Sequence, residues 1–343
     1  MQGIDEDEIS VRGREAMNKG LRRVVKVLGG LMLTTGLLLL TGTAYEAYQS
    51  AQDMKSYTPP GRLYEVSGHN MHLYSAGKGS VTVVLASGWG TPNPYVDFSP
   101  LYDKLKSRVK IAVYDRFGYG YSDYTEQPRD IDTIVDEVHQ LLRKSGQRPP
   151  YIMVGHSLGS LETIRYAQLY PDEVAGIVMI DGGSPEYYST VEMDAPDWYF
   201  DSARFLVKTG IARTLLHSDR MMATLVIDPD LVAEPMKKAA ISSTLKHAYN
   251  DNVMDELHRS KANAARVLKN KQPFSFPLTI LTAGSDQSSE GGRAWQADQA
   301  KFASWSVQGR QQIVPHAKHY IHNSQPDAVA GAILNMAEST GHQ

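Results

Sequence analysis

A serine that follows an apolar segment and lies between two glycines is the strongest chemical signal in this chain of 343 residues. Residues 151–154 are apolar and continue into Gly155-His156-Ser157-Leu158-Gly159, after which helical spacing begins. Small residues two positions before and after the serine permit a sharp strand-to-helix turn, which exposes the serine hydroxyl at the carboxyl edge of a sheet. The Leu158 backbone N–H would lie beside that hydroxyl and could stabilise an oxyanion. This pattern predicts a nucleophilic serine.

A serine hydroxyl needs a neighbouring base to become an effective nucleophile, and the base needs a carboxylate to orient it. Three histidines, His316, His319 and His322, cluster after the last expected strand. His156 lies inside the turn itself, where we expect a packing or pocket role. No carboxylate beside His316 and His319 completes a metal-binding set, so we predict no metal there.

The elements that must position these residues alternate between strand and helix. We expect strands at 62–66, 70–75, 81–86, 110–115, 151–154, 174–180, 277–282 and 310–314, and helices at 95–107, 130–145, 158–170, 293–305 and from Pro326. This alternation predicts an α/β fold with a mostly parallel sheet and helices on both faces. Residues 184–272 contain no strand-like run, so we expect them to form a helical cap inserted into a core of residues 61–183 and 273–343.

The amino-terminal part differs from the rest in composition. Residues 1–26 are polar and include six basic residues, residues 27–45 carry no charge, and residues 46–60 are expected to form a polar linker. Nineteen uncharged residues in a helix span roughly the 30 Å hydrocarbon layer. The basic side of such an anchor normally faces the cytoplasm, which predicts a single-pass membrane protein with an extracytoplasmic catalytic domain.

Three other interpretations of this segment remain. One is a marginal helix, because glycines and threonines dilute the hydrophobicity of residues 27–45. The small residues Gly42-Thr43-Ala44 would suit signal-peptide cleavage and a secreted domain, and a buried core helix is also conceivable. We favour the uncleaved anchor, because the leader is long and acidic for a signal peptide and the apolar stretch has no polar face.

Composition excludes several classes of function. The formal net charge is −3, so no basic field favours nucleic acid as a partner. The absence of cysteine excludes disulfides, cysteine-ligated zinc, iron–sulfur clusters and a thiol nucleophile. No phosphate-binding or dinucleotide-binding glycine motif occurs, and we therefore predict no cofactor.

Three segments resemble the α/β-hydrolase superfamily, and the resemblance covers about residues 60–340. They are Gly155-His156-Ser157-Leu158-Gly159, the segment 114–123 (YDRFGYGYSD) and the segment 317–322 (AKHYIH). The resemblance is closest to capped esterases, peptidases and haloperoxidase-like members. It implies an eight-stranded, mostly parallel sheet and a Ser–His–acid triad with His319 as the base. Ala317-Lys318 departs from the glycine that the family usually has in this loop.

The acid has two candidates. Asp286 follows the strand after which most family members place it, but the spacing Gly284-Ser285-Asp286 is one residue shorter than usual. Asp181 directly ends the preceding strand, where some lipases carry the acid. A carboxylate that orients a base should be held by a rigid element, and Asp286 lies among glycines and serines. We therefore prefer Asp181 and keep Asp286 as the alternative.

The same resemblance places the second oxyanion donor in the loop Ser87-Gly88-Trp89-Gly90, where Ser87 replaces the usual histidine. The donor would be the Trp89 backbone N–H, paired with that of Leu158. Serine at the nucleophile position argues against the epoxide hydrolases and haloalkane dehalogenases of this superfamily, which use aspartate there.

The predicted function is hydrolysis of a small-molecule ester, amide or related acyl substrate through an acyl-enzyme on Ser157. Two alternatives use the same fold. One is a ligand-sensing binding protein with little turnover, against which the intact Ser157 and His319 argue. The other is an acyltransferase or cofactor-free perhydrolase, which differs from a hydrolase only in the acceptor.

Overall fold

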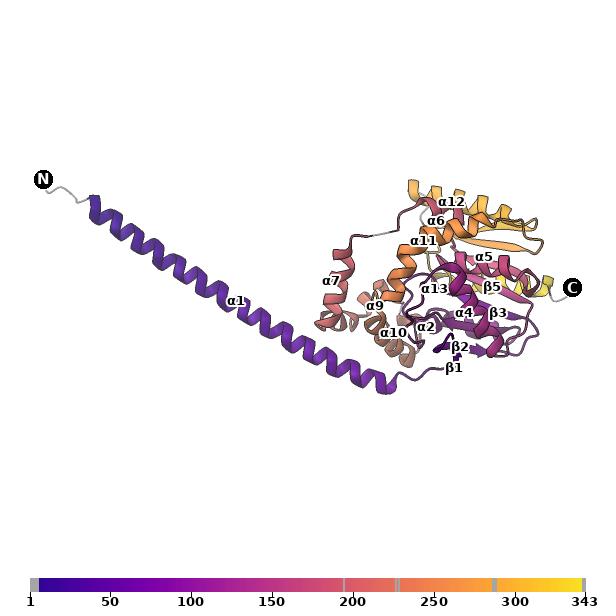
Figure 1. Cartoon of the computed structure of the whole chain (residues 1–343), viewed down its shortest axis with the longest axis horizontal. Helices are drawn as coiled ribbons and strands as arrows, with labels where there is room; N and C mark the ends of the chain where they lie inside the picture. Colours follow the sequence, from indigo (N-terminus) through magenta and orange to yellow (C-terminus); the bar gives the residue numbers. More distant parts are fainter. Residues whose placement is uncertain (1–5, 194, 226, 228, 286–288, 341–343) are drawn as a thin grey trace.

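The chain consists of one long amino-terminal helix and a globular body (Figure 1). The computed structural model describes residues 6–193, 195–225, 227, 229–285 and 289–340. Helix α1 (Glu6–Ser56) runs without a break through the leader, the apolar segment and most of the expected linker. The expectation of a linker from residue 46 therefore fails up to Ser56. Residues 46–56 contain no glycine or proline and are rich in good helix formers, so the helix continues until the approach to Pro59.

The core is an eight-stranded sheet in the order β1-β2-β4-β3-β5-β6-β7-β8. β2 pairs antiparallel with both β1 and β4, and all the other pairs are parallel. This confirms the predicted mostly parallel sheet. The strands are β1 (Arg62–Val66), β2 (His69–Ala76), β3 (Thr82–Ala86), β4 (Lys110–Asp115), β5 (Tyr151–His156), β6 (Val174–Ile180), β7 (Leu278–Ala283) and β8 (Gly309–Val314).

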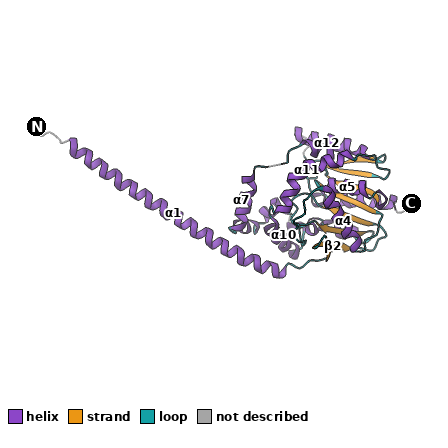
Figure 2. Cartoon of the chain, viewed as in Figure 1, coloured by secondary structure: helices purple, strands orange, loops and turns teal. Residues whose placement is uncertain are grey.

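Helices cover both faces of the sheet (Figure 2). One apolar core lies between the sheet and α4 (Ile131–Lys144), α5 (Gly159–Leu169) and part of the cap. A second core lies on the opposite face, under α3 (Ser99–Leu105) and α14 (Pro326–Thr340). The central strands β3 and β5 are buried along their whole length, as strands covered on both faces must be. The remaining helical elements of the core are α2 (Pro94–Asp97), η1 (Pro171–Glu173), α12 (Glu290–Phe302), η3 (Ala303–Trp305) and α13 (Ile321–Ser324).

Between β6 and β7 the described chain forms helices only. They are α6 (Pro185–Thr190), α7 (Asp197–Lys208), α8 (Ile211–Leu216), α9 (Asp219–Leu225), η2 (Pro229–Leu231), α10 (Glu234–His247) and α11 (Asp251–Lys269). We call residues 185–269 the cap. In Figure 1 the cap lies on the side of the core from which α1 extends, and α1 contacts α7 and α10 directly.

Candidate active site

Ser157 occupies the tight turn between β5 and α5. Its backbone φ is +51°, a left-handed conformation that is uncommon for any residue with a side chain. A Cβ atom at Gly155 would lie 2.6 Å from Oγ1 of Thr163, and one at Gly159 would lie 2.6 Å from the Ser87 carbonyl oxygen. The turn therefore requires glycine on both sides. The strained serine conformation is maintained by packing around it, which is a frequent property of functional residues.

The base and acid predicted from the sequence lie in hydrogen-bond contact. Nδ1 of His319 lies 2.7 Å from Oδ2 of Asp181, which is only 2% exposed. The other oxygen of Asp181 accepts hydrogen bonds from Trp295 Nε1 at 2.9 Å, Gln299 Nε2 at 3.1 Å and the Ala283 backbone N–H at 3.0 Å. The carboxylate is thus held on both oxygens and faces the imidazole in one orientation.

The charge state of Asp181 follows from these contacts. Burial favours the protonated acid, but the hydrogen bonds from His319, Trp295 and the Ala283 N–H outweigh it and hold the pKa of Asp181 below its ordinary value. An ionised Asp181 accepts a hydrogen bond from the Nδ1–H of His319, which leaves Nε2 unprotonated and able to act as a base. The alternative acid, Asp286, lies outside the described residues.

Ser157 and His319 line the same cavity, of about 360 Å³, between the sheet edge and the cap. The cap contributes Met193, Thr244, His247, Tyr249 and Val253 among others. Trp89 forms part of the opposite wall, and its indole N–H donates to the Val253 carbonyl oxygen at 2.7 Å. This bond joins the expected oxyanion loop to α11.

The two expected oxyanion donors lie near Ser157, because Trp89 lines this cavity and Leu158 is the next residue after the serine. A Cβ atom at Gly88 would lie 3.1 Å from Cβ of Ser157, so the loop that carries Trp89 closely approaches the serine. Leu158 directly precedes the first residue of α5, where backbone N–H groups point out of the helix. Among the described turns and loops, neither the Trp89 nor the Leu158 N–H donates to a backbone carbonyl.

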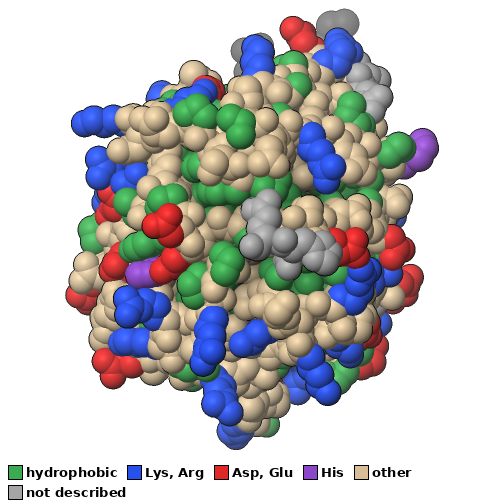
Figure 3. Space-filling model, turned by 90° about the vertical axis from the view of Figure 1, so that its right-hand side faces the viewer, with side chains coloured by type: hydrophobic (Ala, Val, Ile, Leu, Met, Phe, Trp, Pro, Cys, Tyr) green, Lys and Arg blue, Asp and Glu red, His purple; other side chains and the backbone are tan. Residues whose placement is uncertain are grey.

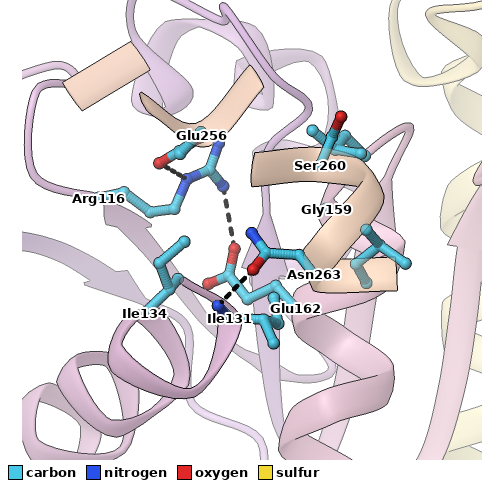
Figure 4. A pocket seen from close by; sticks show the side chains of 10 residues that line it. Arg116, Ile131, Ile134, Gly159, Glu162, Glu256, Ser260 and Asn263 are labelled. Carbon is cyan, nitrogen blue, oxygen red and sulfur yellow. Dashed lines mark hydrogen bonds and ion pairs between the residues drawn. The ribbon is translucent and has the colours of Figure 1, made fainter. Parts of the chain in front are cut away.

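A buried ion network fixes the loop that carries Trp89 (Figure 4). The Arg116 guanidinium donates to the carbonyl oxygens of Ser87 at 2.9 Å and Gly88 at 3.2 Å. The same group pairs at 3.1 Å with both Glu162 of α5 and Glu256 of α11. All three charged side chains are buried. Sequence analysis did not assign Arg116 to the site, because its partners lie 28 to 140 positions away and no local spacing reveals them.

Tyr188 of α6 is a second residue that sequence analysis missed. Burial raises the pKa of its phenol, and the nearby Ser157 side chain partly offsets that increase. The ring is 2% exposed and packs near Trp295, which itself binds Asp181. Tyr188 therefore joins the start of the cap to the serine, a contact that helix periodicity alone cannot reveal.

His156 lies behind the serine in a group of aromatic and polar side chains. Its ring is buried, contacts His319, Tyr320 and His322, and has no hydrogen-bond partner on either nitrogen. Burial, followed by His322 and His319, lowers the pKa of His156 well below its ordinary value, so the ring is neutral.

Asp97, His156 and His322 are the residues whose donor atoms could best hold a metal ion within the described chain, because these atoms lie within 4.8 Å of one another. However, Nε2 of His322 already lies 2.9 Å from Oδ2 of Asp97, a contact that supports the loop carrying His319.

Comparison with known proteins identifies the family of this chain. A sequence model described as the alpha/beta hydrolase family matches residues 83–332, well over half of the chain. The chain belongs to the α/β-hydrolase family. Among curated proteins, the uncharacterized protein YbdG of Bacillus subtilis is 29% identical over 321 residues, which cover 91% of this chain and 96% of YbdG.

Two further comparisons are more limited. Proline iminopeptidase of Saccharolobus solfataricus is 30% identical over 145 residues, which cover 40% of this chain and 43% of the peptidase. The crystal structure of epoxide hydrolase VrEH1 from Vigna radiata superimposes with a TM-score of 0.64 at 14% identity and covers 81% of this chain and 97% of the epoxide hydrolase. At that identity the structural likeness establishes the fold alone. Relatives with hydrolase names, such as the proline iminopeptidase, support the assignment of this chain as a hydrolase.

Proposed function

We propose that this α/β-hydrolase is a serine hydrolase that cleaves an ester, amide or related acyl bond through an acyl-enzyme on Ser157. The observation that carries the proposal is the hydrogen bond between His319 Nδ1 and Asp181 Oδ2 beside the strained serine. An epoxide hydrolase of this superfamily would need aspartate at the nucleophile position, and this chain has serine there.

In the proposed mechanism, Ser157 Oγ attacks the acyl carbonyl while Nε2 of His319 takes its proton. The imidazolium, stabilised by the Asp181 carboxylate, then returns the proton to the leaving alcohol or amine. Water repeats the sequence on the acyl-enzyme and releases the acid and the free serine. No cofactor takes part in these steps.

The backbone N–H groups of Trp89 and Leu158 are the proposed oxyanion donors. Because Arg116 holds the carbonyls of Ser87 and Gly88, the Trp89 N–H would be positioned before the substrate arrives. Pre-positioned donors avoid reorganisation during the reaction, and removing one such donor in other acyl-transfer enzymes costs about 10²–10³ in turnover.

The second part of the proposal concerns location. Among the described residues, one helix, α1, is long and apolar enough to cross a membrane, and its most apolar stretch is not buried. We propose that residues 27–45 are an uncleaved anchor with the amino terminus in the cytoplasm. Two observations support it: the match to YbdG leaves less than a tenth of this chain uncovered and so extends into α1, and Gly42 contacts the cap.

The chemistry is tested with the full chain in detergent micelles and a panel of p-nitrophenyl esters and aminoacyl arylamides. Ser157→Ala should remove turnover by several orders of magnitude, as loss of a nucleophile does elsewhere. His319→Asn should do the same, whereas His316→Asn, a matched change in the same loop, should leave it unchanged. Undiminished turnover in Ser157→Ala would overturn the proposal.

A separate measurement distinguishes a hydrolase from an acyltransferase. If an added alcohol acceptor diverts most of the product to a new ester, the enzyme is an acyltransferase.

A further inference from the structure

The carboxyl-terminal part of α1 packs against the cap at a point that lies within the apolar segment. A Cβ atom at Gly42 would lie 2.3 Å from the carbonyl oxygen of Thr209, so the two backbones meet without a side chain between them. Gly42 is three residues before Tyr45, which corresponds to about 4.5 Å along a helix. If residues 27–45 span the bilayer, the end of α7 lies at the membrane surface.

Buried ion pairs hold the cap in this place. Arg213 of α8 donates from Nε and Nη2 to the two oxygens of Glu46, at 2.7 and 2.8 Å, and from Nη1 to Asp53 at 2.7 Å. Arg213 and Glu46 are each less than a tenth exposed. Such bidentate pairs fix orientation as well as distance. The cap therefore has one position relative to the axis of α1.

An apolar patch lies on the same two cap helices. Six large apolar side chains of α7 and α8 are between 37% and 67% exposed: Trp198, Tyr199, Phe205, Leu206, Ile211 and Leu215. Figure 1 shows α7 on the side of the body that faces α1. At the opposite end of the molecule, Lys, Arg, Asp and Glu side chains are scattered among apolar ones (Figure 3). We call these six residues the α7–α8 patch.

We propose that the α7–α8 patch lies in the lipid interface of the bilayer that α1 spans, an inference that rests on the proposed anchor. The contact between Gly42 and Thr209 sets the depth, and the buried pairs of Arg213 set the orientation. Tryptophan and tyrosine favour this interface, where the ring is apolar and its polar atom stays hydrated. A bilayer would cover apolar side chains that are otherwise exposed to water.

The buried face of α7 connects the patch to the active-site cavity. Phe200, only 3% exposed, packs with its ring centroid 6.4 Å from that of Trp89 and 5.0 Å from that of Tyr249. Both partners line the cavity that contains Ser157. One helix therefore contacts the lipid on one side and the cavity wall on the other. The substrates that fit this placement are acyl amphiphiles that reside in the bilayer.

The absence of cysteine makes a direct depth measurement possible. Single cysteines at Leu38, Phe205 and Val307 would carry the environment-sensitive probe NBD in the full chain, reconstituted into phosphatidylcholine–phosphatidylglycerol liposomes. Val307 is 75% exposed and lies in the loop before β8, outside α1 and the cap, so it is the matched control. We expect lipids with a quenching nitroxide to quench the probes at 38 and 205 several-fold and to leave the probe at 307 unchanged.

The outcomes separate this inference from the proposals on which it rests. Quenching at 38 without quenching at 205 would overturn the membrane role of the patch and leave the anchor intact. No quenching at 38 would overturn both. A blue-shifted but unquenched probe at 205 would indicate a protein partner or a second copy instead of lipid. None of these readouts requires catalysis.

Turnover gives a second test. Phe205→Ser should lower hydrolysis of a long-chain ester embedded in vesicles several-fold and leave that of a soluble short-chain ester unchanged. Equal rates for wild type and Phe205→Ser on the vesicle substrate would contradict delivery from the bilayer, and loss on both substrates would indicate damage to the fold.

Discussion

Asp181 Oδ2 lies 2.7 Å from Nδ1 of His319, although 138 positions separate the two residues in the chain. The parallel sheet makes this contact possible, because β6 and β8 both flank β7 and end at the same edge. Asp181 directly follows β6, and its backbone φ of +45° turns the chain sharply at the strand end.

The first prediction distinguishes the two candidate acids. Asp181→Asn should lower turnover by about four orders of magnitude, because an amide stabilises the wrong imidazole tautomer. Asp286→Asn should stay near wild type. Steady-state kinetics on a soluble ester would measure both. Full activity in Asp181→Asn together with loss in Asp286→Asn would reverse the assignment.

Trp295 should act by positioning the acid. Trp295→Phe removes one of the hydrogen bonds to Asp181 Oδ1 and keeps an aromatic ring in place. Loss of one such bond to a charged group is worth roughly 1.5–3 kcal/mol, which corresponds to about one to two orders of magnitude in kcat. KM should change little. The bond lowers the pKa of Asp181. Its loss should therefore move the fall in activity at acidic pH to a higher pH than in wild type. An unchanged acid limb would contradict this role.

Arg116 should matter for stability as well as for the oxyanion loop. Arg116→Met leaves Glu162 and Glu256 buried without their shared cation, and breaking such a pair costs about 3–5 kcal/mol. Thermal unfolding of the full chain in micelles would measure the loss. Arg204→Ala, which removes an exposed pair with Asp201, is the matched control and should cost at most about 1 kcal/mol. Equal losses of stability in the two variants would show that the buried network stabilises the fold no more than an exposed ion pair does.

His247 should make stability depend on pH. Its ring is 3% exposed, with Nε2 2.6 Å from the Gly120 carbonyl oxygen, and burial together with Lys246 lowers its pKa to about 3. In the unfolded chain a histidine binds a proton near pH 6.5, so this stabilising contribution is complete above that pH and is lost as pH falls toward 3. Between pH 7 and 5 the loss is about 2 kcal/mol.

Urea unfolding at pH 7 and pH 5 would test this for wild type and His247→Gln. The variant keeps a donor for Gly120 and should lose less stability than wild type on acidification. His156 is also buried and neutral, so the stability of both proteins should still decrease somewhat between pH 7 and pH 5. Equal losses of stability in the two proteins would mean that His247 takes up as many protons in the folded chain as in the unfolded chain between pH 7 and 5, which would contradict its lowered pKa.

Much of the fold followed from the sequence because its signals are local. Residues 151–154 before Ser157 are apolar because β5 is buried on both faces, and a helical pattern at 130–145 predicts α4, whose first turn Asp130 caps through the Thr133 N–H. The end of α1 was missed for a local reason too. Residues 46–56 are polar, but polarity does not interrupt a helix, and their helix propensity continues α1 to Ser56.

Features that depend on distant partners could not be predicted. Arg116, Tyr188 and Arg213 have their roles through contacts with other elements, and the residues beside them in the chain do not reveal these contacts. The preference for Asp181 rested on the rigidity expected at a strand end. The three additional hydrogen bonds that hold its carboxylate came only from the folded structure.

The most direct test of the account is the site of covalent labelling by a fluorophosphonate, located by mass spectrometry of the full chain. The account predicts a single adduct on the peptide that contains Ser157, formed at a rate that falls steeply in His319→Asn and Asp181→Asn. Ser157→Ala should remain unlabelled while its unfolding temperature stays near that of wild type. An adduct on another residue, or equal labelling of Ser157→Ala, would contradict the claim that Ser157 is the nucleophile.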